Sequence, residues 1–217
     1  GLCDADIYGP SIPTMFGVQD HKPKPIDVDG KSMMEPVEMH GVKMLSIGFF
    51  ADPDQAIVWR GPMATKALKQ LFTDVVWGEL DYMIVDLPPG TGDIHLTLVS
   101  ELDLTGAIIV STPQDVALLD ARKAINMFER MEVPIIGMIE NMSSYHCPKC
   151  GHEAHIFGHG GAQVDAKKFN LPFLGEIPLE LEIREAGDGG TPVAATESKH
   201  SEAYLNLAQK LIDSNIL

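Results

Sequence analysis

Two carboxylates near the start of the chain have the spacing of a phosphoryl-transfer site. Asp4 and Asp6 lie in the string DADIYGPSIP, Asp4–Pro13, directly after a short apolar segment. Because side chains at i and i+2 of an extended chain point to the same side, both carboxylates are expected to face one site. One of them could support Mg²⁺ while the other orients an attacking water. The alternative is a solvated acidic turn.

A third carboxylate ends an apolar strand in the string YMIVDLPPGTGD, Tyr82–Asp93. Ligands of open parallel sheets bind beyond the carboxyl ends of the strands, which is where Asp86 is expected. It is therefore placed to hold a hydrated Mg²⁺. The loop after it contains Gly90 and Gly92, and its backbone amides are predicted to face a γ-phosphate. The alternative is an acid and a stiff turn that close an ordinary strand.

A C-x₂-C pair forms the third group of chemical interest. Cys147 and Cys150 begin the segment CPKCGHEAHIFGHGG, Cys147–Gly161, and such a pair can bind Zn²⁺ or iron. Two sulfurs fill half of a tetrahedral site, so the other ligands must be nearby histidines or the same pair of a second chain. The nearby histidines are His146, His152, His155 and His159. A redox dithiol or an incidental pair is the alternative. Cys3 is expected to be a small core residue.

The composition narrows the classes of protein that these groups can belong to. Of the 217 residues, 45% are apolar, which excludes a disordered chain. The formal charge of −15 opposes nonspecific nucleic-acid binding and docking on an anionic membrane. Three cysteines with one close pair indicate a reducing compartment, so a cytoplasmic protein is expected.

Alternating strands and helices must position these groups. Short β-branched runs predict strands at Tyr82–Asp86, Gly106–Ser111 and Ile135–Asn141, buried on both faces, with further strands at Val42–Ile47 and Pro172–Ile177. Apolar residues at helical spacing predict helices at Pro62–Val76, Asp115–Met131 and Ser198–Asp213. The stretch HKPKP, His21–Pro25, is expected to be a loop. The pattern predicts an α/β fold, one domain over residues 1–217, whose mostly parallel sheet carries helices on both faces.

Seven strings in this order resemble the Mrp/ApbC family of iron–sulfur cluster carrier ATPases, within the ParA/MinD-like branch of the P-loop NTPases. They are DADIYGPSIP, WRGPM (Trp59–Met63), DYMIVDLPPGTGD, STPQDVALLDARKA (Ser111–Ala124), ENMSSYHCPKC (Glu140–Cys150), IFGHGGA (Ile156–Ala162) and PFLGEIP (Pro172–Pro178). The resemblance runs over essentially the whole chain.

The resemblance implies a role for each group. It assigns Asp4 and Asp6 to the first switch and Asp86 to support of Mg²⁺. It places Gly90, Thr91 and Gly92 in the second switch, and Asn141 and Pro178 in the ATP site, with Asn141 contacting adenine. It makes Cys147 and Cys150 ligands of a [4Fe–4S] cluster shared between the two subunits of a homodimer and handed to apo-proteins. Zn²⁺ is the alternative metal, and neither nucleic acid nor membrane is an expected partner.

One departure from the family pattern is severe. The string G-x-x-x-x-G-K-[ST], the phosphate-binding P-loop, occurs nowhere in the 217 residues. In the family this loop precedes the DAD segment, so we predict that the chain is truncated before it and lacks the first strand, the P-loop and the first helix. We also expect that this chain alone is inactive as an ATPase. Two hypotheses compete with this one. The first is a zinc-stabilised, nucleotide-free scaffold. The second is a ParA/MinD-like positioning ATPase, and the acidic charge and the cysteine pair argue against this second hypothesis.

Overall fold

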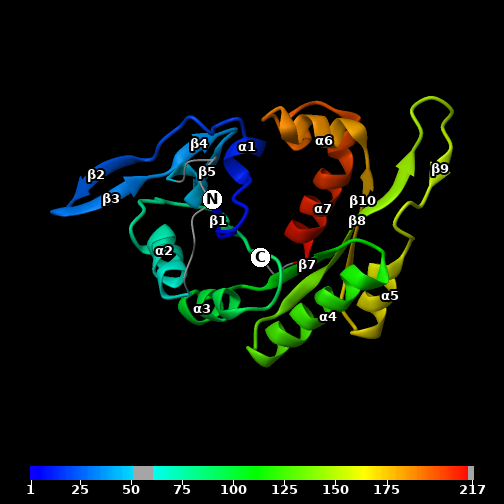
Figure 1. Cartoon of the computed structure of the whole chain (residues 1–217), viewed down its shortest axis with the longest axis horizontal. Coiled ribbons are helices and arrows are strands. Elements are labelled where there is room, and N and C mark those ends of the chain that lie inside the picture. Colours follow the sequence, from blue (N-terminus) through cyan, green and yellow to red (C-terminus); the bar gives the residue numbers. More distant parts are fainter. Residues whose placement is uncertain (51–60, 215–217) are drawn as a thin grey trace. The chain divides into compact units, whose positions relative to one another are not determined.

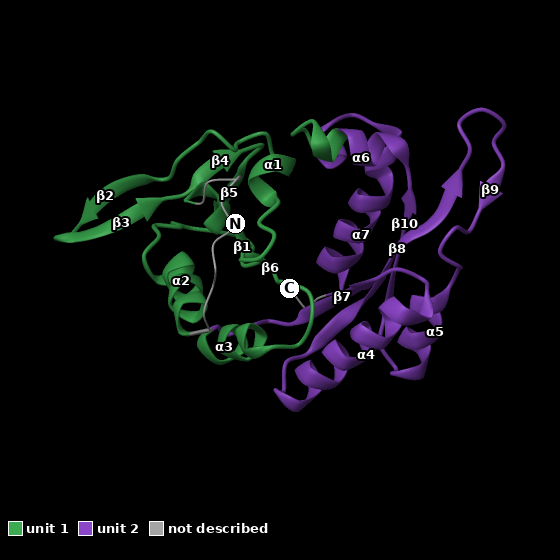
Figure 2. Ribbon diagram, viewed as in Figure 1, with its two compact units in different colours: residues 1–101, 186–192 green, residues 102–185, 193–217 purple. Residues whose placement is uncertain are grey.

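The computed structural model describes residues 1–50 and 61–214 of the chain (Figure 1). These residues form two compact units (Figure 2). Unit 1 comprises residues 1–101 and 186–192, and unit 2 comprises residues 102–185 and 193–217. The α/β class is confirmed in both units, and the prediction of one domain over the whole chain stays a prediction.

A four-stranded sheet forms the centre of unit 1. Its strands, in the order β4-β5-β1-β6, are Val37–Met39, Val42–Ser46, Leu2–Asp4 and Ile84–Asp86. The strand β1 runs parallel to β5 and to β6, whereas β4 is antiparallel to β5. Cys3, Met44 and Leu45 are fully buried in this sheet. The strand β6 was expected to be buried on both faces, and this expectation is wrong, because Ile84 is 54% exposed. In the described sheets, β6 is an edge strand that pairs with β1 alone.

The remaining elements of unit 1 surround this sheet. They are α1 (Ile12–Met15), the hairpin of β2 (Lys24–Val28) and β3 (Lys31–Glu35), the 3₁₀ turn η1 (Ile47–Phe49), α2 (Gly61–Thr73) and α3 (Asp93–Glu101). The expected loop at His21–Pro25 is wrong at its end, because Lys24 and Pro25 already pair with β3. Pro25 is tolerated there because β2 is an edge strand of a two-stranded ribbon.

Unit 2 is built on a parallel sheet in the order β10-β8-β7. These strands are Phe173–Leu179, Ile135–His146 and Ala107–Ser111. The predicted strand at Ile135–Asn141 is correct but too short, because Tyr145 and His146 continue it as partners of the antiparallel strand β9 (Glu153–Ala154). The consecutive residues from Ile136 to Glu140 are all buried, so this part of β8 is covered on both faces.

Helices cover both faces of the unit 2 sheet, as predicted. On one face, α7 (Glu202–Asp213) places Leu207 in a core cluster with Ile139 of β8. On the other face, the Ala162 amide of α5 (Gly161–Lys168) donates a hydrogen bond to Glu140, the next residue of β8. The helix α4 (Asp115–Arg130) packs on β7. The other elements are α6 (Leu181–Asp188), whose last residues belong to unit 1, and the 3₁₀ turns η2 (Val193–Ala195) and η3 (Lys199–Ser201). Among the helices that the structure describes, none has the length and apolarity to cross a membrane.

Candidate functional site

The Asp4 carboxylate is buried and fully engaged by neighbouring groups of unit 1. Its Oδ2 accepts hydrogen bonds from the Ser46 hydroxyl at 2.8 Å and from the Ile12 amide at 3.4 Å. Its Oδ1 accepts one from the Asp6 amide at 3.2 Å. Burial raises the pKa of Asp4 to about 6, and the nearby Asp86 charge adds to the rise. Asp4 therefore holds the end of β1 in place, and its oxygens have little capacity left for a ligand.

Asp6 and Asp86 keep carboxylate oxygens that face no recorded donor. Oδ1 of Asp6 accepts from the Tyr8 and Gly9 amides, both at 3.1 Å, which closes a tight turn after β1. In the part of the chain that the structure describes, the Asp86 carboxylate makes no hydrogen bond or ion pair. Burial raises the pKa of Asp86, and the Asp6 charge raises it further. Two neighbouring carboxylates that repel each other favour a divalent cation between them.

The register of the sheet explains why these acids meet. Asp4 and Asp86 are Cα partners at the carboxyl ends of the parallel strands β1 and β6, and the Ala5 amide donates to the Asp86 carbonyl at 2.9 Å. The DAD segment and the end of the Tyr82–Asp86 strand therefore meet within unit 1. Trp59 and Arg60 of the WRGPM string lie outside the described residues.

A buried histidine that sequence reasoning missed holds the Gly90–Gly92 loop. The Nε2 atom of His95, in the first turn of α3, lies 2.9 Å from the Pro88 carbonyl oxygen and so must donate its hydrogen to it. The His95 amide donates to the Gly92 carbonyl at 3.0 Å. His95 is 4% exposed, and burial lowers its pKa, so the ring is neutral. Gly90 has a φ of 101°, which favours glycine at that turn.

The cysteine pair lies on a short hairpin in unit 2. Cys147 follows the last residue of β8, and the loop closes through the Cys147 amide, which donates to the His152 carbonyl at 2.9 Å. Cys150 is exposed and Cys147 is half-buried, and both are free thiols. Hydrogen bonds from the amides of Lys149 and Cys150, and from the Cys150 thiol, lower the pKa of Cys147. Thiolates are the form that binds metal.

The histidines near this hairpin do not complete a metal site with the two sulfurs. Nδ1 of His155 lies 3.1 Å from the Ser143 carbonyl oxygen, and its ring stacks on that of His159 at 4.4 Å. Within residues 1–50 and 61–214, groups of three or more potential ligands occur at two places, and neither contains a cysteine. Cys3 is fully buried in β1, and burial raises its pKa, which agrees with the expected core role.

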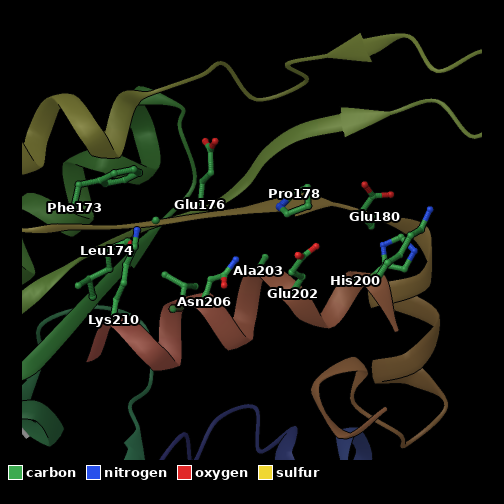
Figure 3. Close-up of a pocket in the computed structure, with 13 residues that line it drawn as sticks. Phe173, Leu174, Glu176, Pro178, Glu180, His200, Glu202, Ala203, Asn206 and Lys210 are labelled. Carbon is green, nitrogen blue, oxygen red and sulfur yellow. The ribbon is translucent and has the colours of Figure 1, made fainter. Parts of the chain in front are cut away.

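Asn141 and Pro178 lie on neighbouring strands of unit 2. The Cα partner of Asn141 is Ile177, directly before Pro178, so the two predicted nucleotide residues belong to one patch of the sheet. Pro178 lines a groove of about 680 Å³ between β10 and α7 (Figure 3). Lys210 also lines this groove, and its Nζ donates a hydrogen bond to the Leu174 carbonyl at 2.6 Å.

A second functional feature that sequence reasoning missed is the buried carboxylate next to Asn141. The two oxygens of Glu140 accept hydrogen bonds from the Gly160 and Ala162 amides, each at 2.8 Å. These amides begin α5, where the backbone has unpaired donors. Gly161 of the IFGHGGA string has a steric reason of its own, because the Cβ of a side chain there would lie 2.3 Å from the Pro113 carbonyl oxygen.

The fold and the acidic groups at the strand ends define a class, the P-loop NTPases of ParA/MinD type. Comparison with solved structures agrees. The cell division ATPase MinD of Pyrococcus furiosus covers 99% of this chain and 85% of its own at a TM-score of 0.66, and at 20% identity this likeness concerns the fold. The nucleotide-binding protein from Archaeoglobus fulgidus, solved with ADP, is 36% identical, covers 93% of this chain and 77% of its own, and has a TM-score of 0.76.

The family follows from sequence comparison. Residues 1–212 match the family described as ParA: NUBPL iron-transfer P-loop NTPase. The iron-sulfur cluster carrier protein of Haemophilus influenzae is 50% identical over 213 residues, which are 97% of this chain and 57% of the relative. The mouse iron-sulfur cluster transfer protein NUBPL is 43% identical over 98% of this chain and 66% of its own length. The chain belongs to this family, and it spans little more than half the length of the Haemophilus influenzae carrier.

Proposed function

We propose that this chain is the core of an iron–sulfur cluster carrier, in which Cys147 and Cys150 hold a [4Fe–4S] cluster that is passed to apo-proteins. The observation that carries the proposal is the cysteine hairpin. It presents two accessible sulfurs, one of them with a lowered pKa, on a loop at the end of β8. Relatives that carry the name of cluster carrier or transfer protein support the same function.

The count of sulfurs supports a cluster shared between two copies of the chain. A [4Fe–4S] cluster is held by four thiolates, and each chain offers two, because Cys3 is sealed in the core of unit 1. The same pair from a second copy completes the set at a two-fold axis. An exposed position suits a cluster that must be released to another protein, whereas a closed site would suit structural zinc.

We further propose that residues of this chain contribute to a nucleotide site. Asp6 and Asp86 offer the oxygens that Mg²⁺ prefers, and the Gly90–Gly92 loop, held by His95, presents its amides to phosphate. In unit 2, Asn141 is proposed to contact adenine and Pro178 is proposed to belong to the nucleotide site. The P-loop string that would hold the β- and γ-phosphates is not among the 217 residues. We place the carrier in the cytoplasm, on the argument from reduced cysteines.

The test is anaerobic reconstitution of the chain and of its Cys147→Ser, Cys150→Ser and Cys3→Ser variants with iron and sulfide. Iron, sulfide and mass in solution are measured for each protein. We expect about four irons per dimer, because the cluster needs four thiolates. Both hairpin variants should lose iron and the cluster-dependent dimer, and Cys3→Ser should keep both.

The zinc scaffold gives a different pattern. One zinc per monomer, lost when His152 or His155 is replaced, would overturn the shared cluster. Iron that is retained in Cys147→Ser and Cys150→Ser would place the cluster on other residues. The Cys3 variant is the matched control, because it removes a thiol from the chain without touching the hairpin.

A further inference from the structure

Four metal-binding side chains meet in unit 2 at the end of the groove between β10 and α7. Glu180 directly follows β10, Glu182 lies in the first turn of α6, and His200 is the middle residue of η3. One ligand atom of each lies within 4.8 Å of the other two. Nδ1 of His146, the last residue of β8, lies 3.6 Å from a carboxylate oxygen of Glu180, although His146 is outside this group of three. We call these four residues the His200 cluster, and Figure 3 shows Glu180 beside His200 at one end of the groove.

The distances within the His200 cluster are too long for hydrogen bonds. The Nε2 atom of His200 lies 3.8 Å from a carboxylate oxygen of Glu182, and Nδ1 of His146 lies 3.6 Å from one of Glu180. Hydrogen bonds between nitrogen and oxygen are about 2.7–3.2 Å long. Ligands bound at about 2.1 Å to one tetrahedral zinc are separated by roughly 3.4 Å. These two distances are longer than hydrogen bonds and close to the separation of two ligands around one zinc ion.

The backbone around the cluster is held by its own contacts. The Ser198 hydroxyl accepts a hydrogen bond from the His200 amide at 3.2 Å, which fixes the turn that carries this imidazole. The His200 side chain is 13% exposed and that of Glu180 is 17% exposed, whereas Glu182 and His146 are about half exposed. Two ligands are thus fixed in the protein and two stand at the surface, which leaves a path for an ion.

We propose that the His200 cluster binds a divalent transition-metal ion of the Zn²⁺ type. Imidazole nitrogens and carboxylate oxygens are ligands of zinc, and Glu180, Glu182 and His200 supply three of them within 4.8 Å of one another. His146, whose Nδ1 lies 3.6 Å from Glu180, is the fourth ligand that we propose. The site contains no sulfur of Cys147 or Cys150, although His146 directly precedes Cys147, and it does not depend on the carrier function. Bound metal would join the ends of β8 and β10 to α6 and η3.

The second group of potential ligands is a weaker candidate. It consists of Glu140, His159 and Glu176. Both oxygens of Glu140 already accept amide hydrogen bonds at 2.8 Å. A metal there would have to displace or share those bonds, whereas within residues 1–50 and 61–214 the carboxylates of Glu180 and Glu182 have imidazoles as their side-chain partners.

The experiment titrates Zn²⁺ into the chain by calorimetry, with Cys147 and Cys150 both replaced by serine so that no thiolate competes. Glu182→Gln and His200→Gln are added singly to this background. The controls are Glu202→Gln, which removes a carboxylate from the same groove, and Glu176→Gln, which tests the second group. Thermal unfolding is recorded with and without Zn²⁺, because an ion that binds the folded chain raises Tm.

We expect one zinc per chain in the background protein and a higher Tm with zinc. Glu182→Gln and His200→Gln should weaken binding by about tenfold or more, because each removes a ligand, and even outer-shell changes cost that much. Glu202→Gln and Glu176→Gln should keep the affinity and the rise in Tm. Equal binding by all variants, loss only in Glu176→Gln, or no binding at all would overturn the site. Unfolding without zinc shows whether Glu182→Gln, an exposed change, leaves the fold intact.

Discussion

At the scale of single residues, the Asp4 carboxylate shows how burial changes the behaviour of an acid. Three hydrogen bonds from Ser46, Ile12 and Asp6 stabilise its charge, yet the loss of water is larger and the pKa rises to about 6. A carboxyl group whose folded pKa lies above its unfolded value of 3.8 favours the folded state when protonated. The free energy of unfolding therefore decreases as the pH rises from about 4 to about 6, because Asp4 ionises less readily in the folded chain than in the unfolded one.

Asp4→Asn removes an ionisation that costs roughly 3 kcal/mol above pH 6 and less toward pH 4, because the shift is about two pKa units. The amide also replaces one acceptor oxygen with a donor, at a cost of about 1–3 kcal/mol. The variant should therefore be slightly more stable than the wild type at neutral pH, and its stability should fall less between pH 4 and pH 6. The measurement is urea unfolding of both proteins at several pH values between 4 and 8. Asp93→Asn, an exposed change in the same unit, should shift stability little and serves as the control. A variant that is less stable than the wild type at pH 8 would show that the hydrogen bonds outweigh the cost of burial.

The three thiols should differ in reactivity at the same scale. The thiolate is the reacting form, and the lowered pKa of Cys147 makes it available at a lower pH than an ordinary thiol allows. Cys3 is fully buried with a raised pKa and should react only after unfolding. Alkylation with iodoacetamide, followed by mass spectrometry at several pH values, measures each site. Labelling of Cys3 in the folded chain at the rate of Cys147 would contradict the model of a sealed unit 1 core.

At the scale of elements, two polar connections fix α5, one to the strand β8 and one to the helix α4. Glu140 accepts the Gly160 and Ala162 amides at the start of the helix. Arg122 of α4 forms a bidentate pair with Asp165 of α5, at 2.6 and 3.0 Å, and Asp165 is 1% exposed. Buried charges are tolerated when they are paired and fully hydrogen-bonded, so both connections depend on their complete partner sets.

Glu140→Gln should destabilise unit 2. The amide of Gln keeps one acceptor and replaces the other oxygen with a donor, so one amide of the α5 start loses its partner at a cost of about 1–3 kcal/mol. Glu176→Gln is the matched control, because Glu176 is the Cα partner of Glu140 on β10 and is exposed. Urea unfolding of both variants compares them. Equal effects of the two changes would mean that the hydrogen bonds to Glu140 contribute nothing beyond charge.

At the scale of the whole molecule, the net charge opposes the proposed pairing of two chains. Two copies with a formal charge of −15 each repel at long range. The Debye length falls from about 30 Å at 0.01 M salt to about 10 Å at 0.1 M. The cluster-loaded dimer should therefore become tighter as salt increases across this range, as measured by sedimentation. A dimer that weakens with salt would indicate that attractive ion pairs dominate the interface.

Nucleotide affinity is a further property of the whole chain. The 217 residues contain no P-loop string, so the amides and lysines that cradle the phosphates are missing from them. We expect the chain to bind ATP weakly or not at all in the presence of Mg²⁺, as measured by calorimetry. Micromolar affinity would show that the acidic strand ends and the base-contacting residues suffice without that loop.

The sequence by itself determined the α/β class, the family and the positions of the main strands and helices. Its apolar runs and helical spacing are local signals, and they matched β7 and α4 to within about one residue, in line with the usual uncertainty of element ends. The helix predicted at Ser198–Asp213 begins only at Glu202, after the 3₁₀ turn η3. The tertiary structure alone decided which groups are buried and which partners they have. The full engagement of Asp4, the anchoring role of Glu140, the support of the Gly90–Gly92 loop by His95 and the convergence of Glu180, Glu182 and His200 all join residues that are distant in sequence or on different elements. Periodicity carries no such information, because burial, hydrogen-bond partners and pKa depend on what packs against a residue from elsewhere in the chain.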